Sequence, residues 1–182
     1  FRLSAEMIRD NALAISGLID FTMGGAPVNP YEMSESFKPT KPTDGNGVYR
    51  RSVYTNWRRT GPPPAMLTFD APRRAVCTPK RERTDSPLQS LVLLNGPQYV
   101  EAARGLAIKI LGSHSHRDPI AVKRVFECCL SRGPDDRELE SANAFLSVGR
   151  LPNEEHLSAP ELASMTVLCQ TIMNHDACVL KR

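Results

Sequence analysis

Proline restricts the folding of this chain more than any other residue, because eleven of its fifteen prolines fall between Pro27 and Pro97. Each proline fixes its own φ angle and lacks a backbone N–H group, so a stretch dense in proline forms neither a long helix nor a central strand. We therefore expect packed but irregular backbone over residues 26–84. A short β-ribbon is an option at residues 49–57 and 66–69, which are rich in strand-forming side chains.

The start of the chain predicts an amphipathic helix. Residues 4–20 carry apolar side chains at helical spacing, and Glu6 lies in the first turn, where the helix dipole favours an acid. We expect Gly24 and Gly25 to end this helix. The apolar positions are Met7, Ile8, Ile15, Leu18 and Ile19.

After Thr84 the sequence shows one helix start after another. The first and last of these starts have the form of a capping box, with Gln89 or Glu161 three residues after the serine and a proline in the first turn. We therefore predict a bundle of about five helices over residues 85–182. The starts are Ser86, Pro97, Asp118, Asp135 and Ser158.

The 182 residues fit a single domain of mainly α class. Its parts are a helix in residues 1–25, the Pro-rich region in residues 26–84 and the bundle in residues 85–182. No stretch approaches the ~18 apolar residues of a membrane-spanning helix, so we expect no membrane span. The chain does not begin with Met, and we expect it to be a piece of a longer protein.

Charge is distributed unevenly, although the net charge is only +3. Residues 50–83 contain nine Lys or Arg and two Asp or Glu, whereas residues 135–182 contain four and eight. The basic stretch either packs on acidic groups of this or a neighbouring domain, or binds an external anion. The small net charge argues against nucleic acid as the partner.

The common motifs of catalytic and cofactor sites are missing from the sequence. There is no phosphate loop, no dinucleotide-binding glycine motif, no Gly-x-Ser-x-Gly, no His-Glu-x-x-His and no Cys-x-x-Cys-His. Cys169, His175 and Cys178 lack a second ligand pair at zinc spacing, so we expect core residues there and no metal or cofactor on this chain. Cys77 lies among arginines and lysines that would stabilise a thiolate, but no histidine is near it in sequence to act as a base.

Several short motifs carry a resemblance to a known family. The motifs are Ala-Glu-Met-Ile-Arg-Asp at 5–10, Arg-Ser-Val-Tyr at 51–54, Trp-Arg-Arg-Thr at 57–60, Phe-Asp-Ala-Pro at 69–72 and Arg-Thr-Asp-Ser-Pro-Leu-Gln at 83–89. With them the chain resembles the planctomycete-type domain of unknown function at the C-terminal end of large secreted proteins, which carry a cytochrome-c-like domain and a second uncharacterised domain upstream. It departs from the family's usual Thr-Asn-Thr-Pro-Leu-Gln at Asp85 and Ser86.

This resemblance implies a mostly helical, extracytoplasmic module, periplasmic or secreted, within a multidomain protein. It also implies that the chain is the C-terminal part of a larger family domain and that neighbouring domains of the parent are its partners. No reaction is implied, so catalytic residues are not assigned and enzymatic activity is left open.

The same motifs place planar donors, flat rings and the helix start at Ser86 near one another in sequence. Anion and sugar sites are assembled from such groups. The structural alternative is that the arginines pair with Asp70, Glu82 and Asp85 and fasten the Pro-rich region to the bundle. The predicted ligand-binding residues are Tyr54, Trp57, Arg58, Arg59, Asp70, Arg81, Arg83 and Gln89.

Two functions agree with this sequence. The first is an interaction or structural module, whose block of arginines and aromatic residues docks a neighbouring domain or binds an anion. The alternative is part of an extracytoplasmic enzyme acting on an anionic polysaccharide, which requires a cleft that holds Asp70, Arg83 or Cys77.

Overall fold

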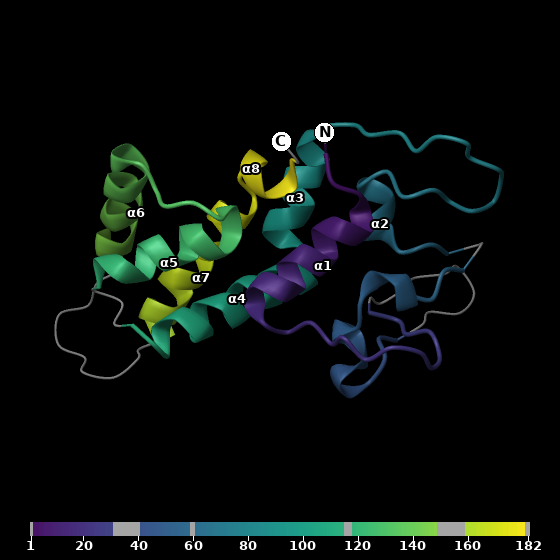
Figure 1. The fold of residues 1–182 in the computed structure, drawn as a ribbon, viewed down its shortest axis with the longest axis horizontal. Coiled ribbons are helices and arrows are strands. Elements are labelled where there is room, and N and C mark those ends of the chain that lie inside the picture. The colour runs from purple at the N-terminus through teal and green to yellow at the C-terminus, as the bar shows by residue number, and fades with distance from the viewer. Residues whose placement is uncertain (1, 31–40, 59–60, 115–117, 149–158, 181–182) are drawn as a thin grey trace.

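The computed structural model describes residues 2–30, 41–58, 61–114, 118–148 and 159–180, and these ranges are mainly helical (Figure 1). They contain eight α-helices, six of them longer than seven residues, and no β-strand. The predicted mainly α fold and the bundle of about five helices are confirmed, because α3 to α7 occupy the predicted segments and only the short α8 follows them. The helices are α1 (Ala5–Ser16), α2 (Pro64–Thr68), α3 (Pro87–Asn95), α4 (Pro97–Leu111), α5 (Pro119–Leu130), α6 (Asp136–Val148), α7 (Ala159–Met173) and α8 (Asp176–Val179).

The centre of the molecule is the packing of α4 between α7 and α1 (Figure 1). One face of α4 is apolar and fully buried, with Leu106 at 0% exposure, and Met165 of α7 is buried to the same extent. Gly105 permits the close approach of the residues that follow α1, because a Cβ atom there would lie 3.3 Å from Leu18 Cδ1. These contacts are the centre of the hydrophobic core that the described residues form.

Helix α1 ends earlier than the sequence suggests. The expected stop at Gly24 and Gly25 is wrong, because Gly17 takes a left-handed φ of 80° and its N–H group bonds to the carbonyls of the last turn. Only glycine adopts this conformation without strain, so the helix ends there. Met7 is 55% exposed, and the buried face instead includes Arg9.

The Pro-rich region contains no β-ribbon within its described residues. Within residues 49–57, Tyr49 ends the 3-10 helix η1 (Gly45–Tyr49) and residues 52–54 form the 3-10 helix η2 (Ser52–Tyr54). The residues beside these helices make only isolated bridges to other segments, such as Asp20 to Arg50. Residues 66–69 belong to α2 and its C-cap, because Pro64 at the first helical position already has the φ of a helix. The strand option was therefore wrong at both places.

A buried arginine fastens this region to the helices. Arg9 on α1 is 2% exposed and donates to the carbonyl oxygens of Val48, at 2.6 Å, and of Arg50, at 2.8 Å. It also donates to Ser52 Oγ at 3.1 Å and, through Nε, to Gln98 Oε1 at 3.1 Å. One guanidinium thus satisfies backbone of the Pro-rich region that has no partner in a helix or sheet.

A second buried arginine organises the loop that follows α1. Arg50 is 8% exposed and donates to the carbonyl oxygens of Thr22, at 3.1 Å, of Ala26, at 3.0 Å, and of Gly24. The Arg50 guanidinium also stacks 3.9 Å from the centre of the Tyr54 ring. The Pro-rich region therefore takes its shape from two side chains and not from a sheet.

The two ends of the described chain lie side by side (Figure 1). The Leu3 N–H group donates to the Val179 carbonyl at 2.9 Å, and Arg2 and Leu180 form an antiparallel bridge. His175 caps α8, because its Nδ1 accepts the Ala177 N–H group at 3.0 Å.

The described helices include none that is long and apolar enough to cross a membrane.

Helix α6 begins with a capping box. The Glu138 N–H group donates to Asp135 Oδ1 at 2.7 Å, and the Asp135 N–H group donates to Glu138 Oε2 at 2.8 Å. The Arg132 guanidinium donates hydrogen bonds to both carboxylate oxygens of Glu138, at 2.7 and 2.6 Å. These hydrogen bonds, the one from Arg132 first, lower the pKa of Glu138 to about 2.

Replacing Glu138 by Gln is expected to lower stability in a pH-dependent way. The depressed pKa means that the ionised group stabilises the fold above its usual pKa of 4.5, and that this stabilisation is lost as the pH falls through about 2. The gap in urea midpoint between wild type and E138Q should be widest near neutral pH and should shrink as the pH drops from about 4.5 toward about 2. A gap that stays constant over this range contradicts the assigned ion pair.

Candidate functional site

The candidate site is built around an exposed basic segment between α2 and α3. Residues 73–85 are all exposed and contain no helix or strand, and Figure 1 shows this part of the chain extending away from the helices. We call residues 73–83 the basic arm, since they hold five basic residues and one acidic residue, a net charge of +4. The charged residues are Arg73, Arg74, Lys80, Arg81, Glu82 and Arg83.

The first end of the basic arm is fastened by Trp57. The indole Nε1–H group donates to the Arg73 carbonyl at 3.2 Å. The Arg74 guanidinium lies 4.8 Å from the centre of the Trp57 ring, a distance suited to a cation–π contact. Arg74 also has a left-handed φ of 58°, so the chain turns sharply here.

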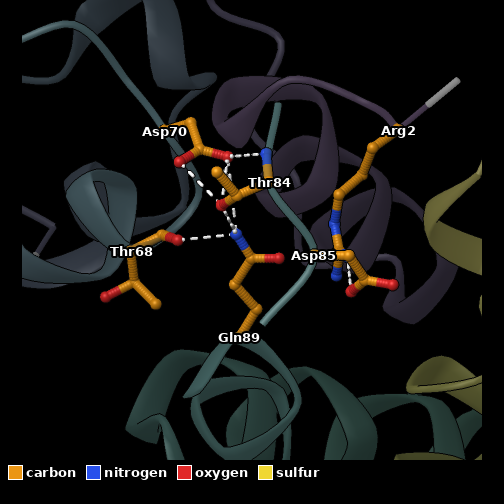
Figure 2. Close-up of polar contacts among 6 residues, drawn as sticks. All are labelled: Arg2, Thr68, Asp70, Thr84, Asp85 and Gln89. Atoms are coloured by element: carbon orange, nitrogen blue, oxygen red, sulfur yellow. Dashed lines mark hydrogen bonds and ion pairs between the residues drawn. The ribbon is translucent and has the colours of Figure 1, made fainter. Parts of the chain in front are cut away.

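The second end is fastened by Asp70, Thr84 and Gln89 (Figure 2). Asp70 accepts the Thr84 N–H group at 2.6 Å, and its two oxygens accept the Thr84 hydroxyl at 3.0 and 2.9 Å. Gln89 Nε2 donates to the Thr68 carbonyl at 2.9 Å and to Thr84 Oγ1 at 3.2 Å. Asp70 takes a φ of 60°, a strained value for a residue with a side chain, which these bonds hold in place.

The capping box predicted at the start of α3 is wrong. The Ser86 side chain makes no capping hydrogen bond, although Ser86 is the N-cap residue. Gln89 does not reach back to Ser86 with its side chain, because the amide is fully buried against Thr68 and Thr84. The second predicted box includes Ser158, which lies outside the described residues.

Two ion pairs tie the end of the arm and the residues just after it to the first residues of the chain and to α1. Arg81 pairs with Glu6 at 2.8 Å, and Arg2 pairs with Asp85 (Figure 2). Burial alone raises the pKa of Glu6, but the hydrogen bonds from Arg81 and from the backbone outweigh it, and the pKa is lowered. The structural alternative foresaw arginine–acid pairs of this kind, but with Asp70, Glu82 and Asp85 as the partners of the predicted arginines.

The structure brings only some of the predicted site residues together. Asp70, Arg81 and Arg83 line a cavity of about 30 Å³ together with Arg2, and Gln89 lies within reach of Asp70 at 3.5 Å. Trp57 lies at the other end of the arm, and Tyr54 has different partners, since its hydroxyl accepts the Gly24 N–H group at 2.7 Å.

The two predicted site residues not yet placed are Arg58 and Arg59. Arg58 is half-buried and has interaction partners, and the exposed Arg83 also has partners. Arg59 lies outside the described residues.

Sequence reasoning missed Arg2, Arg9 and Arg50, which perform most of the fastening. A signal for Arg9 exists, since it lies four residues after Ala5 and three before Ala12, on the buried face of α1. Arg50 was counted among the basic residues but gave no local sign of being buried. Its ligands are backbone carbonyls about 25 residues earlier in the chain, which no local pattern reveals.

The five cysteines form no disulfide among the described residues, and they differ in their exposure to solvent. Cys77 is exposed on the basic arm, whereas Cys129, Cys169 and Cys178 are buried in the bundle. Burial raises the pKa of Cys169 to about 12 and that of Cys178 to about 11, so these thiols stay protonated and unreactive. Within the described ranges, no three His, Cys, Asp or Glu side chains gather in a group that could hold a metal ion.

The fold and this segment together define a class of protein. It is a mainly helical domain in which buried arginines fasten a Pro-rich region and a tethered basic arm extends into solvent. The chain belongs to the PSD1 family, described as proteins of unknown function (DUF1553), because the sequence model of that family matches residues 1–146. No curated protein and no solved structure matches it. The predicted resemblance to a domain of unknown function is confirmed at this level.

Proposed function

We propose that this chain is an interaction module that uses its basic arm to dock on an acidic surface of a neighbouring domain in an extracytoplasmic multidomain protein. The observation that carries the proposal is that a segment of net charge +4 is exposed along its whole length while both of its ends are fastened. Tethering reduces the conformational entropy lost on binding, and complementary charge speeds and orients the encounter.

The shape of the arm supports docking. Lys80, Arg81, Glu82 and Arg83 line an open hollow at the surface, where an acidic group of a partner can reach them. Val76 is 77% exposed in the free part of the arm and offers an apolar contact beside the charges. Such a mixture of basic and apolar groups suits a protein surface.

The alternative, part of an extracytoplasmic enzyme acting on an anionic polysaccharide, has less support. The cavity beside Asp70 and Arg83 measures about 30 Å³, which is room for about two water molecules and not for a sugar ring, and the larger hollow that Arg83 also lines includes neither Asp70 nor Cys77. Cys77 is exposed on the arm and does not line this cavity.

Charge reversal on the arm tests the docking proposal. The double variant R73E/K80E changes two exposed side chains that make none of the fastening contacts of the arm, so the fold should persist. We expect its affinity for the remaining domains of the parent protein, supplied as a separate polypeptide, to fall at least about tenfold at low salt, since each 1.4 kcal/mol is tenfold. Isothermal titration calorimetry at two salt concentrations measures this.

The matched control is R104E/K123E, which reverses two exposed charges on α4 and α5 and should keep the wild-type affinity. Equal affinities for both double variants count against the arm as the docking surface. Tighter binding to heparin than to the parent's domains, with the same loss in R73E/K80E, favours an anionic polysaccharide as the partner.

A further inference from the structure

A second candidate site is formed by α5, α6 and α7, and α6 lies at the other end of the molecule from the basic arm (Figure 1). Residues of these three helices line a cavity of about 410 Å³. Its volume falls within the range of about 300–1,000 Å³ that is typical of small-molecule pockets. The basic arm takes no part in it, so the inference is independent of the proposed function.

The interior of the cavity is apolar. Phe126, Ala142, Leu168 and Ile172 line it and are each about 5% exposed, and Phe145 remains 43% exposed beside them. Two phenyl rings and two branched side chains suit an aromatic or branched apolar body, whose burial is favourable at about 25 cal/mol per Å². The half-exposed Phe145 would lose contact with water when such a body enters.

Polar and charged side chains also line the cavity, and some of them already have hydrogen-bond partners while others do not. Arg132 binds both oxygens of Glu138 and compensates its charge, and Asp135 accepts the Glu138 N–H group through Oδ1. Arg137 lines the mouth and has no hydrogen-bond or ion-pair partner among the described residues.

The second uncommitted donor is His175. Because its Nδ1 accepts the Ala177 N–H group, the ring proton of the neutral imidazole is on Nε2, which is free to donate at the mouth. Ser141 adds an exposed hydroxyl on the α6 side. The lining therefore adds an unpaired guanidinium, an imidazole N–H group and a hydroxyl to the two carboxylates, and these donors favour a ligand whose polar end accepts hydrogen bonds.

We propose that this cavity binds a small amphipathic carboxylate, with its aromatic or branched apolar body against Phe126 and Phe145 and its carboxylate paired with Arg137 and His175. A carboxylate suits these donors for two reasons. Its oxygens only accept hydrogen bonds, and its charge is opposite to that of the Arg137 guanidinium. A neutral alcohol of the same shape fills the cavity but leaves the pairing with Arg137 unused.

Calorimetric titration with phenylbutyrate and with phenylbutanol tests the inference on the full chain. We expect the acid to bind about tenfold or more tightly than the alcohol, a difference of about 1.4 kcal/mol. R137Q should remove most of this preference while leaving the affinity for the alcohol unchanged. H175N should weaken it, since asparagine keeps an N-cap acceptor for α8 but lacks the Nε2 donor.

Two further variants test whether both compounds bind inside this cavity. S141W places a large ring at the mouth from an exposed position and should abolish binding of both compounds, whereas K123Q, which removes an exposed charge elsewhere on α5, should change neither. Three results overturn the proposal: no binding of either compound to folded wild type, equal binding of acid and alcohol, or unchanged affinity in S141W. We expect R73E/K80E to bind phenylbutyrate with the wild-type affinity, which would show that this cavity functions independently of the basic arm.

Discussion

Replacing Arg9 by Met is expected to lower the free energy of unfolding by about 3–5 kcal/mol, the cost of breaking a buried charged network by removing one member. Arg9 is 2% exposed and bonds to two carbonyl oxygens and two side-chain oxygens of other segments. Methionine keeps the apolar stem but leaves the Val48 and Arg50 carbonyls without their donor. Each buried unsatisfied group costs about 1–3 kcal/mol. Urea unfolding followed by circular dichroism measures the change.

Two controls sharpen this result. R104M makes the same replacement at an exposed position of α4 and should alter stability by less than about 0.5 kcal/mol. R9K keeps the charge but loses the planar fork, so it should fall between wild type and R9M. If R9M matches R104M, then Arg9 does not fasten the Pro-rich region. Limited proteolysis of R9M should also give faster cleavage within residues 41–58, because their anchor is gone.

Replacing Gln89 by Glu is expected to destabilise the domain by at least about 3 kcal/mol at neutral pH, because it buries an unpaired charge. Gln89 is 0% exposed, and its Nε2 donates to the Thr68 carbonyl and lies 3.5 Å from Asp70 Oδ2. Glutamate exchanges this donor for an acceptor and puts a carboxylate beside Asp70. Thermal and urea unfolding of Q89E measure the loss.

The pH dependence of Q89E identifies the cause of its instability. Burial and the neighbouring carboxylate raise the pKa of the introduced group above its unfolded value of about 4.3, so the unfolded state releases the proton more readily. The deficit against wild type should therefore grow as the pH rises through the raised pKa and be smallest below about pH 4.3. The protonated carboxyl can again donate to Thr68.

The matched control is Q170E, in which the same exchange is made at an amide that donates to the Leu94 carbonyl at 2.9 Å in an exposed contact. Water replaces that bond, so the loss should stay below about 1 kcal/mol. Equal losses in Q89E and Q170E show that Gln89 is not buried in a network of donors and acceptors.

Most of the fold was predictable because helix starts and stops are local. Asp118 caps α5 by accepting the Ile120 N–H group at 2.9 Å, and α4 runs from Pro97 to Leu111 between the predicted punctuation at Gly96 and Gly112. These signals depend on groups within one or two turns of each other, so a short window contains them. The capping box at Ser86 failed because a distant carbonyl, that of Thr68, competed for Gln89.

The candidate site was predictable only in its composition. The sequence showed a basic segment with Trp57 and Asp70 near it, but only the structure shows that Trp57 holds one end of the basic arm and Asp70 the other. It did not show that Tyr54 belongs to the separate group around Arg50, because that depends on where the loop after α1 returns.

The sequence by itself therefore determined the helical class, the segments that form the main helices and the place of the charge. Only the tertiary structure decided which arginines are buried, which carbonyls they satisfy and which basic residues are left in solvent. The physical reason is range: capping and proline effects act between residues a few positions apart, whereas Arg9 and Arg50 bond to groups 24 to 89 positions away in the chain. Such pairings exist only after the α4–α7 core has brought distant segments together.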